Sequence, residues 1–169
     1  MPLSSTLAIM ASANQTAALD LGVASAPVNL SRSVTLGSGT GVGKADRIFH
    51  DRRVLNASAT EDLDLAGVLV DAFGQTITFA RIKGLLVSAA AGNSNNVVIG
   101  AAASSPWATA FNATGTLTLR PGASVALMAG AADATAYGVT ASTGDLLKIA
   151  NSGAGSAVTY DVVIIGASA

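Results

Sequence analysis

Cysteine is absent from this chain of 169 residues, which excludes disulfide scaffolds, thiolate metal sites and cysteine nucleophiles together. Aromatic residues make up only 4% of the chain and charged residues only 11%, and the net charge at pH 7 is −1. So small a net charge gives no overall field that would attract nucleic acid or an anionic membrane. The sequence also lacks the basic stripe with interleaved aromatic residues that nucleic-acid binding requires. We therefore expect no nucleic-acid partner.

Long apolar runs are missing as well. A membrane-spanning helix needs roughly 20 consecutive apolar residues, whereas here Gly, Ser, Asn and Thr interrupt every apolar run. A secretory signal needs a basic start before its apolar stretch, but residues 1–26 contain neither Lys nor Arg, and the run Leu7–Ala11 is short. The sequence therefore predicts no membrane partner and no signal peptide, and its length suits one domain with a buried core.

The few charged residues are unevenly distributed. Eight of them lie between Asp46 and Asp64, and only five lie in the 86 residues from Gly84 to the C-terminus. Proteins rarely expose so little charge unless a partner covers part of their surface. Because the short apolar runs argue against lipid, we expect this cover to be protein, namely further copies of the same chain.

Composition divides the chain near residue 45. Residues 1–45 are rich in Ser, Ala, Thr and Gly, have weak periodicity and end in the glycine-rich run 37–43. We expect a flexible or extended N-terminal arm there, with short strands at residues 19–23 and 33–36. Residues 46–169 form the second unit, in which turn residues recur about every 8–12 positions between short strands. This spacing predicts an all-β domain, a β-sandwich for which the jelly roll is our preferred topology.

The last strand is the clearest in the sequence. Val158, Tyr160, Val162 and Ile164 alternate with polar residues and share one face. At the C-terminal end the opposite face is apolar too, so we expect a second sheet to cover one face and a neighbouring subunit to cover the other.

Two other segments have mixed patterns. In residues 77–87, Arg81 and Lys83 share a face with apolar residues, which predicts a bulge or a strand that crosses from core to rim. Residues 64–73 fit a strand and turn, or alternatively a short helix, because Leu65, Val68, Leu69 and Ala72 have helical spacing.

Motifs for catalysis fail on spacing. The run from Gly37 to Lys44 resembles a phosphate-binding loop, but Ser38 stands where the Walker pattern needs Gly, and Ala45 where it needs Ser or Thr. His50 is the only histidine, which excludes a multi-histidine metal centre, and no G-x-S-x-G elbow accompanies it. We therefore predict no catalytic residue, cofactor or metal site, no enzyme activity, and a surface or interface hydrogen bond for His50.

Charged residues of both signs form the candidate interface. Ion pairs between subunits contribute little affinity at a rim, but they fix register and partner choice. The alternative for the acidic members, together with Asp71, is a calcium site, although they lack the spacing and central glycine of an EF-hand loop. The candidate interface residues are Arg47, His50, Arg52, Arg53, Glu61, Asp62, Asp64, Arg81 and Lys83.

Trp107 is the single tryptophan. If it is exposed together with Tyr137 and Tyr160, the three rings form a surface on which a sugar would stack, and the protein is a carbohydrate-binding module. If it is buried, it anchors its loop against the end of the sandwich, which is the outcome that we expect.

Six segments follow one another in a familiar order: Asp64–Gly67, Asp71–Gly74, Ile77–Lys83, Leu119–Gly122, Gly144–Asn151 and Tyr160–Ile165. Together they resemble small structural proteins of tailed bacteriophages. More narrowly, they are similar to auxiliary head proteins, also called decoration or cement proteins, which are encoded beside the major capsid protein. The resemblance covers about residues 46–169 and lies in the general character of these segments and in the order of the strands.

The resemblance implies a β-sandwich or jelly roll, a homotrimer in many members, bound to the major capsid protein on the outside of the phage head. It implies a location in the virion after synthesis in the host bacterial cytoplasm, and no catalytic residues. The arm of residues 1–45 has no counterpart that we can place, and we expect it to order on the capsid or against a neighbouring subunit. The alternative is a tail, head-fibre or receptor-binding module, although no coiled coil or triple-β repeat is visible.

Overall fold

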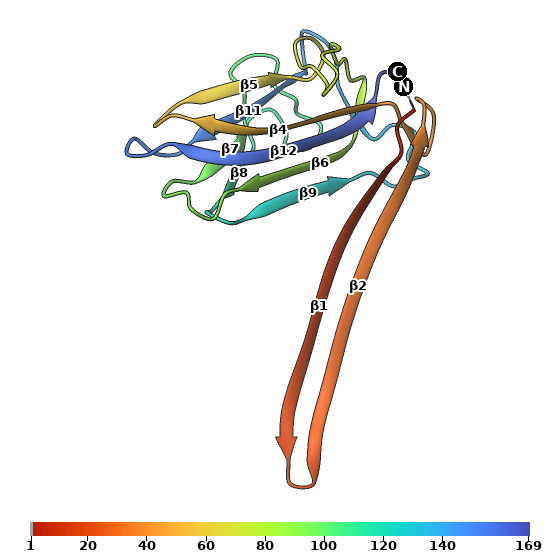
Figure 1. Cartoon of the computed structure of the whole chain (residues 1–169), viewed down its shortest axis with the longest axis vertical. Coiled ribbons are helices and arrows are strands. Elements are labelled where there is room, and N and C mark those ends of the chain that lie inside the picture. Colours follow the sequence, from red (N-terminus) through yellow and green to blue (C-terminus); the bar gives the residue numbers. More distant parts are fainter. Residues whose placement is uncertain (1) are drawn as a thin grey trace.

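The structure is a computed structural model, and it describes residues 2–169. All the regular elements in this range are β-strands, so no helix among them is long and apolar enough to cross a membrane. Two sheets pack face to face, and a long two-stranded hairpin stands out from them (Figure 1). The predicted all-β sandwich is thus confirmed, and the jelly-roll topology stays a prediction.

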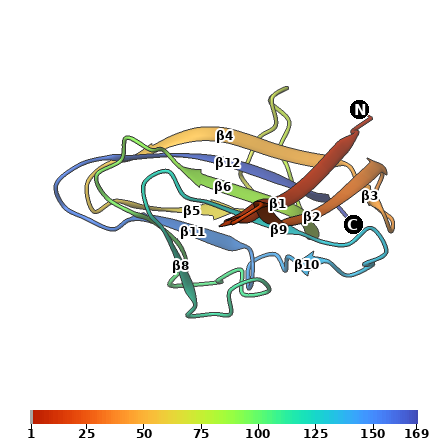
Figure 2. The same cartoon turned by 90° about the horizontal axis from the view of Figure 1, so that it is seen from below.

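The sandwich has two layers, which Figure 2 shows one above the other. In the first sheet β12 lies between β4 and β6, and both β9 and β10 pair with the far edge of β6. Its strands are β4 (Arg47–Leu55), β6 (Arg81–Ala89), β9 (Ser124–Met128), β10 (Tyr137–Gly138) and β12 (Val158–Ala167). The second sheet has the order β5 (Thr60–Asp64), β11 (Leu146–Asn151), β7 (Val97–Gly100) and β8 (Thr116–Leu119).

Side chains from both sheets form one core. The four alternating residues of β12, from Val158 to Ile164, are at most 1% exposed, as the period of two predicts. Leu147 and Ile149 of β11 belong to the same cluster. Three of the four central strands, β12, β11 and β7, lie in the poorly charged region from Gly84 onward, so burial inside the sandwich accounts for part of its low charge without a partner.

The predicted bulge is present in β6. Ile165 of β12 pairs with Gly84, but the next residue, Gly166, pairs with Ile82, so Lys83 is the extra residue. The bulge turns the Lys83 side chain inward, where it is only 1% exposed and its Nζ donates a 2.8 Å hydrogen bond to the Asp133 carbonyl. Burial, with the nearby positive charge of Arg81, lowers the pKa of the Lys83 ammonium.

The N-terminal arm is a regular β-hairpin. β1 (Ser5–Leu19) pairs with β2 (Gly22–Ser38) along its whole length, and β3 (Lys44–Ala45) adds a short parallel pairing at the base. The strand expected at residues 19–23 is wrong, because Asp20 and Leu21 form the two-residue turn of this hairpin. The strand expected at 33–36 lies within β2.

The base of the hairpin covers the outer face of the first sheet. Leu36, Ala45 and Ile165 are buried together in a second cluster, and Leu7 and Val163 pack against it. We expected a neighbouring subunit to cover this end of β12, but the protein's own hairpin does so.

Residues 64–73 form turns, so the helical alternative is wrong. Leu65 and Leu69 face the core, whereas Val68 is 72% exposed and Ala72 is exposed too. A helix would have placed all four on one face. Instead the Leu65 amide donates to the Asp145 carbonyl and the Leu65 carbonyl accepts from the Phe79 amide, which ties this segment between two others.

Candidate functional site

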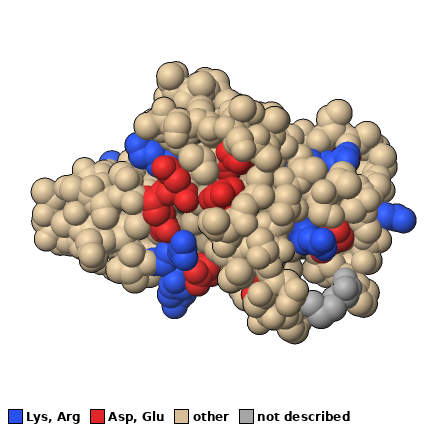
Figure 3. All heavy atoms as spheres, turned by 90° about the horizontal axis from the view of Figure 1, so that it is seen from above, with Lys and Arg blue, Asp and Glu red and all other residues tan. Residues whose placement is uncertain are grey.

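Charged side chains gather on the face opposite the hairpin. Figure 3 views this face directly and shows acidic side chains near its middle, flanked by basic ones. β4 is an edge strand of the first sheet and β5 an edge strand of the second, so segment 46–64 closes one open edge of the sandwich. We call the exposed residues of β4, β5 and loop 66–76 the charged face.

A hydrogen-bonded network joins the two sheets at this edge. Glu61 of β5 accepts a 2.6 Å bond from the Tyr160 hydroxyl and a 2.9 Å bond from Arg53 Nε. Arg53 also donates to Asp51 at 3.0 Å. Burial, followed by the bond to Glu61, raises the pKa of Tyr160, so the phenol stays protonated. Glu61 thus accepts from a buried phenol and is held by Arg53, so these two candidate interface residues are paired within one chain.

Arg52 is also paired within the chain. It faces Asp161 across the β4–β12 ladder, and its Nε and Nη2 donate to the two carboxylate oxygens at 2.7 and 3.0 Å. This bidentate contact lowers the pKa of Asp161. We expected Arg52 to find its acidic partner in another subunit and overlooked Asp161, because only the strand register reveals this pair.

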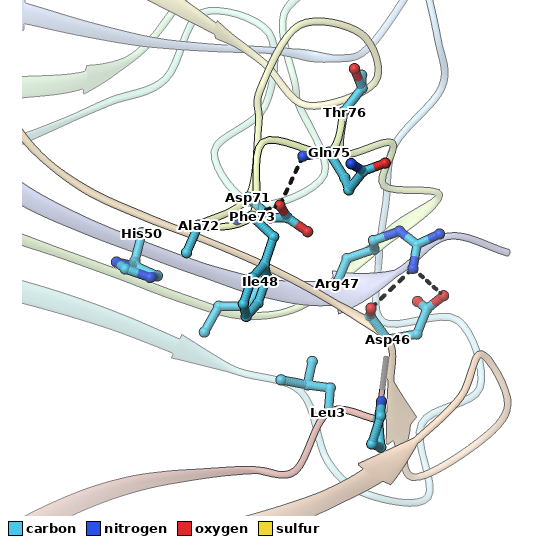
Figure 4. Close-up of a pocket in the computed structure, with 11 residues that line it drawn as sticks. Leu3, Asp46, Arg47, Ile48, His50, Asp71, Ala72, Phe73, Gln75 and Thr76 are labelled. Carbon is cyan, nitrogen blue, oxygen red and sulfur yellow. Dashed lines mark hydrogen bonds and ion pairs between the residues drawn. The ribbon is translucent and has the colours of Figure 1, made fainter.

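Arg47 and His50 line a hollow of about 490 Å³ beside the start of β4. Figure 4 shows Arg47 extending beside Asp46, to which Nη1 is bonded at 3.1 Å. Two bonds from Ser168 fix the Asp46 carboxylate in turn. A guanidinium has five N–H donors, so Arg47 keeps capacity for a ligand or partner. Apolar residues, including Leu3 and Ile48, complete the wall.

Loop 71–75 forms the opposite wall of this hollow. Oδ1 of Asp71 accepts the amides of Phe73 at 2.8 Å and Gln75 at 2.9 Å, and Gly74 supplies the positive φ of the turn. This turn leaves the Phe73 side chain 71% exposed and Val70 51% exposed. Exposed apolar side chains rimmed by charge are typical of protein-binding surfaces. We did not predict the exposure of Phe73, although the Asp-Ala-Phe-Gly run marks a turn.

The other candidate residues are scattered. Asp62 is exposed on the outer face of β5, and Asp64 accepts the Ala66 amide at 2.9 Å in the turn after β5. Arg81 donates to the Ala134 carbonyl and Lys83 to that of Asp133, so both hold loop 130–136 against β6, away from the charged face. The candidate set therefore separates into residues of the charged face and two structural cations.

Three other possibilities lose support from the geometry. In the glycine-rich run, the amides of Gly37, Gly39 and Lys44 donate to carbonyls of the same segment, so they do not form a phosphate cradle. Trp107 is buried and donates to the Gly138 carbonyl at 2.9 Å, which confirms the loop anchor and removes it as a sugar platform. Within residues 2–169, the acidic residues nowhere combine with each other or with His50 into a group of three or more that could hold a metal ion.

Comparisons with protein-family models, with curated proteins and with solved structures find no match for the chain.

Proposed function

We propose that the protein is a structural virion protein, a capsid decoration protein that binds the outside of a phage head and stabilises its lattice. The observation that carries the proposal is the projecting hairpin, about 50 Å long at roughly 3.4 Å per residue. A two-stranded hairpin alone is marginally stable in water. A chain with a long projecting hairpin is therefore suited to an assembly in which other chains pack against that hairpin. The resemblance of residues 46–169 to auxiliary head proteins indicates which assembly.

In this proposal the two ends of the molecule have different partners. The charged face binds the major capsid protein, with Phe73 as its apolar contact and Arg47 and His50 at its rim. The opposite end serves contacts between copies of the chain, which form a homotrimer. If the protein binds only the expanded lattice, it stabilises that state by mass action. No cofactor or catalysis is needed for this role.

Particles that lack the protein test the function. We expect complete particles to retain their DNA at higher temperature and at higher chelator concentration than particles without it. Equal resistance of the two kinds of particle would refute the stabilising role.

Phe73→Asp tests the proposed capsid surface. Because Phe73 is exposed, the substitution should leave the fold intact and weaken binding to undecorated particles about 10-fold or more. Thr118→Asp is the matched control, since it adds the same charge at an exposed position of β8 in the second sheet. Equal binding by both variants would exclude the charged face as the capsid contact.

The hairpin also favours a second candidate, a head-fibre or receptor-binding module in which the hairpins form a stem. The same particles distinguish the two functions. Loss of host adsorption with unchanged thermal resistance supports the fibre, and loss of thermal resistance with unchanged adsorption supports decoration.

A further inference from the structure

The two faces of the hairpin differ in polarity. Directly paired residues of antiparallel strands project from the same face, so the register assigns every side chain of β1 and β2. The apolar face contains Leu7, Ile9, Ala11, Ala13, Ala17, Leu19, Ala24, Ala26, Val28, Leu30, Val34 and Leu36, with Ser5, Gln15 and Arg32 as its polar members. The polar face contains Thr6, Ser12, Asn14, Thr16, Ser25, Asn29, Ser31, Ser33 and Thr35, among a few apolar residues.

The base of the apolar face is already packed. Leu7 and Leu36 lie against the outer face of the first sheet, and the approach is so close that a Cβ at Gly84 would lie 2.5 Å from Leu7 Cδ1. Beyond this base the same face continues into solvent, where Leu30 is 49% exposed and Val28 is 62% exposed. Figure 1 shows the hairpin standing clear of the sandwich over this length. The uncovered part is therefore the continuation of a surface that packs on protein.

The size and charge of the uncovered part restrict its partner. From Ile9 to Leu19 it is about 37 Å long at roughly 3.4 Å per residue and about 10 Å wide across two strands. Its area of about 370 Å² is that of the largest apolar patch on a typical soluble protein, and patches of this size are often binding surfaces. Arg32 is its only charged residue, so the surface suits neither an acidic partner nor a nucleic acid.

The shape of the apolar face is complementary to itself. Small Ala11 and Ala13 on β1 stand opposite large Leu30 and Val28 on β2. When copies are related by an axis parallel to the hairpin, β2 of one copy lies beside β1 of the next at the same height. Leu30 and Val28 of one copy then meet Ala11 and Ala13 of its neighbour, which is the interdigitation that packed sheets need.

We infer that the apolar face of the hairpin is the self-association surface of this protein. Hairpins of neighbouring copies lie parallel around a common axis, turn their apolar faces toward that axis and toward one another, and leave their polar faces in solvent. Arg32 lies near the base, and its long side chain reaches solvent past the packed sheets. The inference rests on the self-association part of the proposed function and is independent of capsid binding.

Neighbouring residues on opposite faces provide the matched test. Leu30→Asp places a carboxylate in the proposed interface, and Ser31→Asp places the same charge on the polar face. By light scattering we expect the wild type and Ser31→Asp to have a multiple of the 16.5 kDa chain mass. Leu30→Asp should dissociate about 100-fold more readily, because its charge would be buried without a partner. Unchanged fluorescence of Trp107 confirms that the sandwich is folded.

A monomeric wild type would overturn the inference, and so would equal masses of the two variants. A monomeric wild type that still decorates particles would leave the capsid proposal standing. An oligomeric wild type that never binds particles would refute the capsid proposal and leave the self-association inference standing.

Two adjacent alanines test the parallel orientation. Ala17 lies on the apolar face and Ala18 on the polar face, both near the tip. The chain has no cysteine, so Ala17→Cys and Ala18→Cys each introduce a single thiol. With a bis-maleimide that spans about 10 Å, the separation of packed sheets, we expect Ala17→Cys to link neighbouring copies and Ala18→Cys to stay unlinked. Equal linking, or no linking of Ala17→Cys, would overturn the parallel arrangement.

Discussion

The sandwich and the hairpin use the same secondary structure with opposite results for burial. Alternate residues of β12, such as Tyr160 and Ile164, are fully buried because a second sheet covers them. Alternate residues of the hairpin, such as Val28 and Leu30, stay about half exposed or more because no second layer lies over them. Among the described residues of β1 and β2, Leu36 is the one buried hydrophobic residue.

The contrast shows that period-two alternation determines which side chains share a face of a strand, but not whether another layer covers that face. The sandwich contains both of its layers within one chain, and buried apolar area is the main source of its stability. The hairpin contains one layer, so its stability beyond the base depends on what packs on it. One region is therefore complete as a single chain, and in our proposal the other is completed by an assembly.

A matched pair of leucines tests this contrast with the largest expected effect. Leu147→Ala removes a side chain that is 1% exposed in the core, and we expect it to lower the free energy of unfolding by about 2–5 kcal/mol. Leu30→Ala removes a half-exposed side chain of the hairpin, so the sandwich should lose less than about 0.5 kcal/mol. Urea unfolding followed by Trp107 fluorescence measures both. Similar losses would show that the two regions share one core.

Glu61→Ala tests the network that closes the sandwich edge. The substitution leaves the buried Tyr160 hydroxyl and Arg53 without their shared acceptor, so we expect a loss of about 1–3 kcal/mol. Asp62→Ala is the control, because the adjacent carboxylate points to solvent from the other face of β5 and should matter little. If Asp62→Ala is as destabilising as Glu61→Ala, the network is not what holds this edge.

Gly84→Ala tests the joint between the two regions. Its Cβ would overlap the end of the Leu7 side chain, and we expect the hairpin base to loosen at a cost of about 1 kcal/mol. Amide hydrogen exchange near Leu7 and Leu36 should quicken while exchange in β11 stays unchanged. The double variant with Leu7→Ala removes the overlap and should recover part of the loss. Additive losses would mean that the two side chains do not meet.

The sequence predicts the sandwich well because its core residues are large. Val, Ile and Tyr mark one face of β12, and the charged pair in 77–87 marks the bulge at Lys83. The hairpin escaped prediction because much of its apolar face is alanine, which hardly stands out from the Ser and Thr of the other face. The run Leu7, Ile9, Ala11, Ala13 alternates, and a pattern that counts alanine as apolar would have detected it.

The candidate site was predictable in location but not in pairing. Segment 46–64 supplies the two strands of the charged face, β4 and β5, because both are edge strands on the same side of the sandwich. Which charge meets which depends on register across β4, β12 and β5, and Arg52 with Asp161 are far apart in sequence. Phe73 escaped because its exposure follows from a turn that Asp71 closes, a contact that composition does not encode.

The smallest expected effect concerns the pH dependence of the surface pair. Arg52 lowers the pKa of Asp161 in the folded protein, so below the ordinary Asp value of about 3.9 the unfolded chain binds more protons than the folded one. The stabilisation from this pair is therefore present above that value and is lost as the pH falls through the folded pKa. The hydrogen bonds from Ala136 and Thr135 lower the pKa of Asp133 as well, and that contribution is common to the wild type and to variants of Arg52.

Arg52→Gln isolates the contribution of the pair. We expect the variant to be slightly less stable than the wild type at pH 7, and the two urea midpoints to converge as the pH is lowered from 5 to 2.5. The difference should be small and should shrink in salt, because both side chains are exposed to solvent. Parallel curves over the whole range would show that the pair contributes no pH dependence. Burial alone would then distinguish the stability of the sandwich from that of the hairpin.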